Sequence, residues 1–179
     1  NLLTYQKIVT MIPALAPSMR NALLIGQGAG HMVETLKESG IVTDTLEIDP
    51  AVADAASEHF GFIPTGRRIL GDARYEVRQL KGPYDLIILD VFTGGSEPTH
   101  LLTVEAIAQL RDLLTDKGIL ALNFVAFYDN GQNPALASVA KTLTQVLPHQ
   151  RGLISDPNEY LNDFIFLATN HVLDLNDES

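Results

Sequence analysis

The feature that most constrains the fold is a regular alternation of short apolar runs with segments of helical spacing. Short apolar runs bounded by glycine or aspartate are typical of strands buried on both faces of a sheet. They predict strands over residues 21–26, 42–49, 67–72, 84–90 and 117–125. The segments between them predict helices over 30–40, 50–61, 73–80, 101–114 and 134–147, after a leading helix over 4–15 that Pro13 bends or ends.

This alternation predicts right-handed βαβ units, and therefore a parallel sheet with helices on both faces. Two further apolar runs, 151–155 and 162–169, predict an antiparallel C-terminal hairpin. The expected fold class is α/β and Rossmann-like, with a mostly parallel seven-stranded sheet. The 179 residues fit a single domain, with a leading helix and entry segment over 1–20 and a polar tail over 170–179.

The composition excludes several classes of function. A formal net charge of −10 argues against nucleic acid as a partner, because phosphate binding needs clustered Lys and Arg. The acidic balance suits a cationic small molecule, or solubility alone. The chain has no cysteine, and its five histidines never stand four residues apart or as an HxH pair, so we expect no metal.

The chain begins at Asn1 and carries neither a signal peptide nor an apolar run long enough to span a bilayer. We therefore expect no membrane contact by the chain itself. We expect a cytoplasmic protein, or the soluble part of a longer, membrane-anchored one. The sequence leaves a homodimer open.

The carboxyl ends of the predicted parallel strands should hold the functional residues, because ligands of open α/β sheets bind there. The first strand ends in the turn Gly26-Gln27-Gly28-Ala29-Gly30, which allows a ligand to approach bare backbone. His31 occupies the position where the dinucleotide fingerprint has glycine or alanine. The turn therefore indicates a nucleoside without specifying a dinucleotide.

The second and third strands end in acidic residues, two of which could either bind a ligand or cap a helix. Glu47 is suited to accept hydrogen bonds from both hydroxyls of a ribose, and Asp49 is either a second ribose ligand or the cap of the helix at Pro50. Asp72 either accepts a hydrogen bond from an adenine amino group or caps the helix that begins at Ala73.

The fourth strand ends in Asp90. Aspartate is depleted from strand interiors, so its position at the end of an apolar run indicates either a functional carboxylate or a structural cap. Burial there raises a carboxyl pKa, which suits a proton acceptor. The loop that follows, with Gly94 and Gly95, has the composition of a lid over the site. The four strand ends together predict a site for adenosine with a small substituent.

With these residues in hand, the chain resembles the spermidine synthase-like aminopropyltransferases, which share the S-adenosylmethionine-dependent methyltransferase fold. The resemblance covers residues 3–169 and rests on an ordered set of motifs. They are "TYQKIVTMIPAL", "LLIGQGAG", "LEIDPAV", "GDAR", "YDLIILDVF" and "PTHLLTVEAIAQLRDLLTDKGILALN".

The resemblance implies an aminopropyl transfer in polyamine biosynthesis, from decarboxylated S-adenosylmethionine to a small-molecule amine. Asp90 would take a proton from the amine, and Tyr5 would act with it in catalysis. The implied amine-binding residues are Gln6, Thr93 and Glu97. The implied donor-binding residues are Gly26, Gln27, Gly28, Gly30, Glu47, Asp49, Asp72 and Ala73.

The chain departs from the family on the amine side of the site. Ala29, Thr93 and Lys7 stand where the family has carboxylates, and Glu97 is the candidate to compensate for them. Burying a polyamine cation without counter-charges costs several kcal/mol per unpaired ion. The family's amino-terminal β domain is also absent from these residues, which we expect to represent the catalytic domain alone.

Two alternatives follow from these departures. One is an S-adenosylmethionine-dependent methyltransferase with another acceptor, in which amides near Gly28 bind the donor carboxylate and Ala29 no longer repels it. The other is a domain of a larger protein that binds the nucleoside without turnover. The fold alone does not choose between them, because one fold hosts many chemistries.

Overall fold

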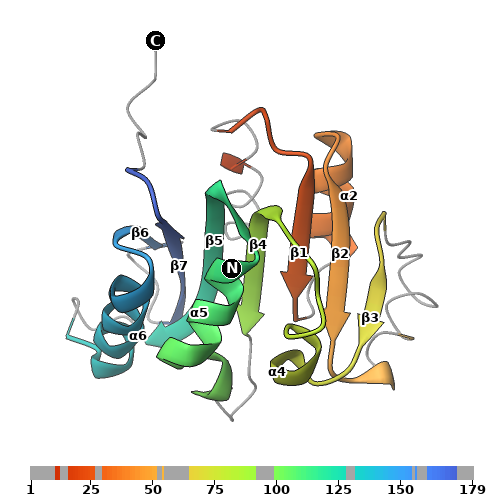
Figure 1. Ribbon diagram of the computed structural model, residues 1–179. Helices are drawn as coiled ribbons and strands as arrows, with labels where there is room; N and C mark the ends of the chain where they lie inside the picture. The colour runs from red at the N-terminus through yellow and green to blue at the C-terminus, as the bar shows by residue number, and fades with distance from the viewer. Residues whose placement is uncertain are drawn as a thin grey trace.

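The computed structural model describes residues 11–12, 16–26, 30–51, 54, 65–91, 99–127, 132–154, 156 and 161–172. Within these residues seven strands form one sheet in the order β3-β2-β1-β4-β5-β7-β6 (Figure 1). The strands are β1 (Asn21–Ile25), β2 (Val42–Glu47), β3 (Arg68–Leu70), β4 (Tyr84–Val91), β5 (Leu114–Phe127), β6 (His149–Ile154) and β7 (Leu161–Thr169).

The sheet is parallel from β3 to β5 and becomes antiparallel at β7, which lies between β5 and β6. The carboxyl ends of β1, β2 and β4 therefore share one edge, and the amino end of β7 lies at that same edge. This is the predicted α/β sheet with its antiparallel C-terminal hairpin, so the expected fold class is confirmed.

Helices cover both faces, as Figure 1 shows, with α4, α5 and α6 in front of the sheet and α2 behind it. The helices are α2 (Gly30–Glu38), α4 (Ala73–Glu76), α5 (Val104–Asp112) and α6 (Pro134–Val146), with a 3-10 turn η1 (Thr99–Leu101). Among the helices of the described segments, none combines the length and apolar character that crossing a bilayer requires.

Alternate side chains of each strand feed two separate cores, because successive residues of a strand point to opposite faces. In β4, Ile87 and Leu89 join the core under α5 and α6, whereas Leu86 and Ile88 join the core under α2. All four side chains are fully buried. By this alternation, Asp90 continues the row of Leu86 and Ile88 and points to the α2 side.

The boundaries differ from the expected ones around α5 and β5. The helix begins at Val104, three residues later than expected, because the Thr103 hydroxyl accepts a hydrogen bond from the Ala106 amide and caps it. The strand already begins at Leu114, which pairs with Tyr84, and the register then shifts so that Ile119 pairs with Leu86. The polar residues between these pairs form an irregularity in the strand that hydrophobic spacing does not reveal.

Candidate active site at the carboxyl edge of the sheet

Gly26 directly follows β1 and adopts a conformation that favours glycine. Its φ is +95°, and its amide donates a hydrogen bond to the Leu46 carbonyl at 3.0 Å. A Cβ at this position would lie 2.1 Å from the carbonyl oxygen of Asp90. The glycine therefore allows the ends of β1 and β4 to approach, while Gly30 begins α2 and Gln27, Gly28 and Ala29 lie outside the described residues.

Glu47 ends β2 beside this turn and is half-buried. Its Oε1 accepts a hydrogen bond from the Asp49 amide at 3.0 Å, which fixes the direction of the side chain. Its Oε2 is buried and has no hydrogen-bond partner among the described residues. A buried carboxylate oxygen without a partner is costly, so this atom is a candidate acceptor for hydroxyl groups of a ligand.

Asp49 and Asp72 both have the local capping geometry that the sequence left open. Asp49 Oδ1 accepts from the Ala51 amide at 2.8 Å, beside the turn at Pro50. Asp72 is the N-cap of α4 and accepts from the Arg74 amide at 2.8 Å, while Ala73 begins the helix and is buried. Capping thus accounts for one oxygen of each side chain, and a ligand role for them remains a prediction.

Asp90 is the most strongly perturbed acid of the candidate site. It is the second-last residue of β4 and is only 7% exposed. Burial raises the pKa of its carboxyl to about 6, the Asn123 amide partly opposes this by donating at 3.1 Å, and the negative charge of Asp163 adds to the increase. A carboxylate with this pKa is ionised near neutral pH and is still a competent proton acceptor.

Asn123 and Asp163 are site residues that the sequence reasoning missed. Asn123 lies in β5 directly opposite Asp90, and Asp163 lies in β7 opposite Val125, so all three side chains point to the α2 side. The amide of Asn123 donates to both carboxylates, to Asp90 at 3.1 Å and to Asp163 at 3.4 Å. The available signals were a polar residue inside the apolar run "LALNFVAF" and an acid at the start of the run "NDFIFLAT".

The remaining predicted site residues lie outside the described residues. They are Tyr5, Gln6, Thr93 and Glu97, together with Lys7 at a family position. Within the described part of the chain, no group of three His, Asp or Glu side chains is arranged to hold a metal ion. The described half of the site therefore consists of a glycine turn, the acids at the ends of β2 and β4, and the cluster on β5 and β7.

Comparison with curated proteins gives relatives of two kinds. A polyamine aminopropyltransferase of Vibrio vulnificus is 38% identical over 114 residues, which cover 60% of this chain and 38% of that protein. An N-terminal histidine N-methyltransferase of Emericella nidulans is 41% identical over 109 residues, covering 58% of this chain and 20% of that protein. The chain thus spans less than half the length of either relative. No protein-family model matches the sequence.

Solved structures share the fold over nearly the whole chain. A spermidine synthase in complex with the transition-state analogue AdoDATO superposes with a TM-score of 0.77 at 24% identity, covering 96% of this chain and 61% of that one. The human methyltransferase-like protein 13 in complex with SAH gives a TM-score of 0.71 at 20% identity, with 94% and 81% covered. At these identities the likeness establishes the fold.

Proposed function

Because this chain resembles the polyamine aminopropyltransferases in sequence and has the fold of S-adenosylmethionine-dependent methyltransferases, we propose that it transfers a carbon group from an S-adenosyl sulfonium to a nitrogen nucleophile. The favoured reaction is aminopropyl transfer from decarboxylated S-adenosylmethionine to an amine. One observation carries the proposal, the buried Asp90 with its raised pKa at the carboxyl end of β4. Both kinds of curated relative are named for reactions at nitrogen.

The described residues fit the nucleoside half of such a donor. The buried Oε2 of Glu47 offers an acceptor for ribose hydroxyls. The turn at Gly26 keeps side-chain atoms away from the space beside the end of β4. Asp72 and Ala73 would contact the adenine at the end of β3, with Asp49 near the ribose, and Gln27, Gly28 and Gly30 would complete the turn. The bound sulfonium would supply a carbon that a nitrogen lone pair can attack.

Asp90 would prepare the nucleophile. A primary amine is an ammonium ion near neutral pH and has no lone pair to donate. Asp90 therefore takes one proton from the ammonium, and the neutral nitrogen then forms the new C–N bond while the C–S bond breaks and its electron pair stays on sulfur. The new nitrogen is again cationic, and Asp90 releases its proton to solvent. Tyr5, Gln6, Thr93 and Glu97 are proposed to line the acceptor pocket.

A second candidate is methyl transfer to nitrogen, which the 41% identical N-methyltransferase supports. Its donor keeps the carboxylate that decarboxylated S-adenosylmethionine lacks. Backbone amides of the turn from Gly26 to Gly30 would bind that carboxylate, and Ala29 places no negative charge beside it. Asp90 has the same proton-accepting role in both reactions.

Calorimetric titration with three ligands tests the donor site and separates the two reactions. The ligands are methylthioadenosine, S-adenosylmethionine and its decarboxylated form. Tightest binding of the decarboxylated form supports aminopropyl transfer, whereas preference for the carboxylated form supports methyl transfer. If none of the three binds, the proposal is wrong, and the acids at the strand ends serve only to cap and order the backbone.

The Asp90→Asn variant tests the proton acceptor. We expect the rate of transfer to fall by about 10²–10⁴-fold, the usual contribution of a general base, with donor affinity unchanged. The matched control is Asp116→Asn, the same chemical change at an exposed position remote from the carboxyl edge, which should retain full activity. Unchanged turnover in Asp90→Asn would remove Asp90 from the mechanism.

A further inference from the structure

A pocket of about 330 Å³ opens at the amino edge of the sheet, at the other end of the strands from Asp90. Its walls come from the first residues of β1, β2 and β4 and from the segment that leads into β4. The volume lies at the lower end of the range of about 300–1,000 Å³ in which proteins bind small molecules. The size therefore suits a small organic ligand.

Two cations and one acid line the pocket, and the acid balances one of the cations. Asp44 accepts hydrogen bonds from Nε and Nη2 of Arg67 at 3.1 and 2.8 Å, so these two charges offset each other. Lys81 is exposed and has no hydrogen bond or ion pair with any described residue. The lining therefore has one uncompensated positive charge, although the chain as a whole has a formal net charge of −10.

Arg67 is held in place more firmly than its exposure suggests. Its side chain is 61% exposed, yet Asp44 fixes Nε and Nη2, and the Tyr84 hydroxyl accepts a further hydrogen bond from Nη2 at 3.1 Å. The two N–H groups on Nη1 have no partner among the described residues. A guanidinium that is already fixed loses little side-chain entropy when it binds an anion, so the pocket has a preorganised donor.

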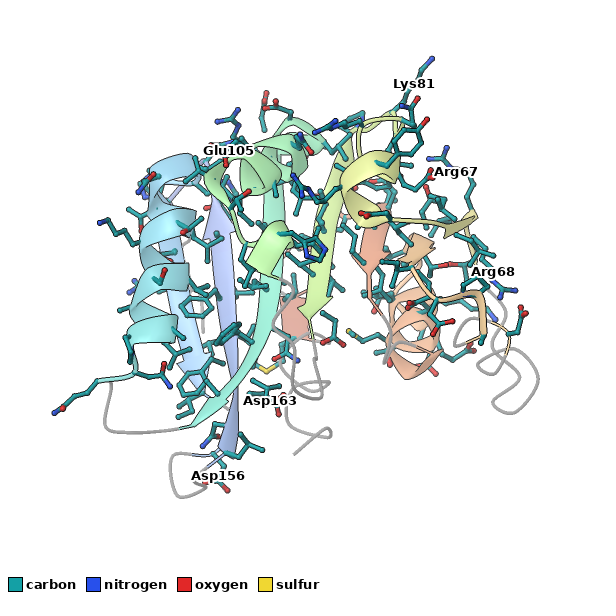
Figure 2. All side chains as sticks on the ribbon, turned by 90° about the horizontal axis from the view of Figure 1, so that it is seen from below. Arg67, Arg68, Lys81, Glu105, Asp156 and Asp163 are labelled. Atoms are coloured by element: carbon teal, nitrogen blue, oxygen red, sulfur yellow. The ribbon has the colours of Figure 1, made fainter. Side chains whose placement is uncertain are left out.

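The positive charge near the pocket is a local feature of the sequence. Residues 67–81 contain five of the chain's twelve Lys and Arg residues and two of its twenty-two acids. Figure 2 shows Arg67 and Lys81 on the same side of the molecule and well away from Asp163. Clustered charge of one sign beside a concave surface raises the local concentration of ions of the opposite sign. The amino edge therefore favours an anion, in contrast to the acidic candidate site at the carboxyl edge.

We propose that this pocket is a second ligand site, separate from the candidate active site, and that it binds a small organic carboxylate. The carboxylate would contact Nη1 of Arg67 and the Lys81 ammonium, and the apolar part of the ligand would cover Val42 and Pro83. Val42 is a large apolar side chain that is 51% exposed in the pocket wall, and covering it is favourable. The inference goes beyond the proposed function and does not depend on it.

The charge of the pocket favours a carboxylate over a phosphate. One uncompensated positive charge equals the charge of a single carboxylate, whereas a phosphate monoester carries about −1.5 to −2 charges near neutral pH. The ligand should also have an apolar part, because Val42 and Pro83 offer no polar side-chain atom.

Titration of the chain with butanoate, followed by heteronuclear NMR at about 0.15 M ionic strength, tests the site under conditions that screen weak surface attraction. We expect saturable shifts of the backbone amides of Arg67, Lys81 and Tyr84. Butanamide, which has a similar size and no charge, should bind at least about tenfold more weakly, because the charge-assisted hydrogen bonds are lost. Shifts that do not saturate, or equal binding of the two compounds, would overturn the proposal.

The decisive variant is Lys81→Gln, which removes the uncompensated charge without breaking a hydrogen bond to any described residue. We expect the Kd for butanoate to rise about three- to tenfold, the contribution of one partly exposed charge pair, with the stability of the protein unchanged. The matched control is Lys141→Gln, the same change at an exposed position of α6, which should leave the Kd unchanged. Equal affinity in Lys81→Gln and the wild type would contradict the proposal.

Two further ligands decide the chemistry of the anion and the place where it binds. Inorganic phosphate has no apolar part and should bind more weakly than butanoate, and binding at least as tight as that of butanoate would overturn the assignment to an organic carboxylate. Methylthioadenosine at saturation should leave the affinity for butanoate unchanged. If butanoate shifts the amides of Glu47 and Asp90 instead, and methylthioadenosine displaces it, the anion binds at the carboxyl edge and the proposal is wrong. Failure of methylthioadenosine itself to bind would count against the proposed function alone.

Discussion

Asp44 and Asp90 are two buried aspartates of the same sheet whose surroundings differ. They are 9% and 7% exposed, and both lie within parallel strands. Asp44 is near the amino edge and accepts hydrogen bonds from the Tyr84 hydroxyl at 2.7 Å, the Arg67 amide at 2.7 Å and the Arg67 guanidinium at 2.8 Å. Within the described part of the chain, Asp90 at the carboxyl edge accepts a hydrogen bond from Asn123 and lies near the like charge of Asp163.

The two carboxyl groups are perturbed in opposite directions. Burial alone would raise the pKa of Asp44, but the hydrogen bonds from Tyr84 and Arg67 outweigh it and hold the pKa below its ordinary value. Burial raises the pKa of Asp90 to about 6 because one amide is too little compensation. Two aspartates of similar solvent exposure therefore differ in role. Asp44 is a structural acid because Tyr84 and Arg67 stabilise its charge, whereas Asp90 is more strongly desolvated and has less compensation, which suits a reactive acid.

The shape of the surface, taken alone, would place a binding site at the amino edge, away from Asp90. A pocket of about 330 Å³ opens at the amino edge, and its lining includes Asp44, Arg67, Lys81 and Tyr84. The polar groups of Asp44, Arg67 and Tyr84 are already bonded to one another. Buried atoms without a partner among the described residues occur at both edges, because they include Thr43 Oγ1 beside Asp44 as well as Glu47 Oε2 and Asn123 Oδ1. What distinguishes the carboxyl edge is the buried Asp90, whose carboxyl has a raised pKa.

The largest effect on stability is expected from Asp44→Ala. The substitution leaves the Tyr84 hydroxyl and the Arg67 amide without their acceptor, and should lower the free energy of unfolding by about 3 kcal/mol. Chemical denaturation at pH 7.5 measures the change. Asp54→Ala is the control, because its exposed ion pair with Arg68 should contribute less than about 1 kcal/mol. Equal losses in the two variants would mean that the hydrogen bonds of buried Asp44 stabilise the protein no more than an exposed ion pair.

The next prediction is a gain in stability, and its size depends on pH. Asp90 has a raised pKa, so its contribution to stability is fully present below its ordinary value and is lost as the pH rises through about 6. Asp90→Asn does not titrate and should be more stable than the wild type by about 3 kcal/mol at pH 7.5, with the difference falling steeply toward pH 4 and vanishing below it. Denaturation curves between pH 4 and 8 measure it, and a stability difference that is constant with pH would contradict the raised pKa.

The smallest expected effect on stability is that of Tyr84→Phe, which removes one of the hydrogen-bond donors to Asp44 and leaves the others. Asp44 keeps its bonds to Arg67, so the variant should lose about 1 kcal/mol of unfolding free energy. The wild-type tyrosine should also ionise late, because burial and the Asp44 carboxylate raise its pKa to about 12. Ultraviolet titration of both proteins isolates this group, and a Tyr84 that titrates with ordinary tyrosines would contradict the network.

The sequence predicted the fold through patterns that local physics determines. Continuous apolar runs predicted β1 and β4, and Asp72 was predicted as a possible cap of α4. The start of β5 was not predictable, because polar residues 115–118 fall inside the strand and are tolerated where the register with β4 shifts. Such a shift depends on pairing with a distant strand, which spacing along one chain does not contain.

The candidate site was likewise predictable where local patterns determine it and not where it depends on the pairing of distant strands. Glu47 and Asp90 were predictable because parallel strands expose their carboxyl ends at one edge, so a polar residue at each end is informative. Asn123 and Asp163 were missed because their meeting depends on the antiparallel register of β5 and β7, which are separated by a helix and β6. Asp72 was ambiguous in the sequence because capping and ligand binding call for the same residue type at the same place.

The position of β7 has a consequence for the synthesis of the protein. β7 inserts between β5 and β6, both of which leave the ribosome before it, and within the described strands β6 pairs only with β7. Until residues 161–169 emerge, the outer edge of β5 has no partner and β6 has no sheet to join. A nascent chain that stalls or is cut before Leu161 would expose that edge, which is a template for aggregation. The strand that delivers Asp163 is therefore also the one that completes the sheet.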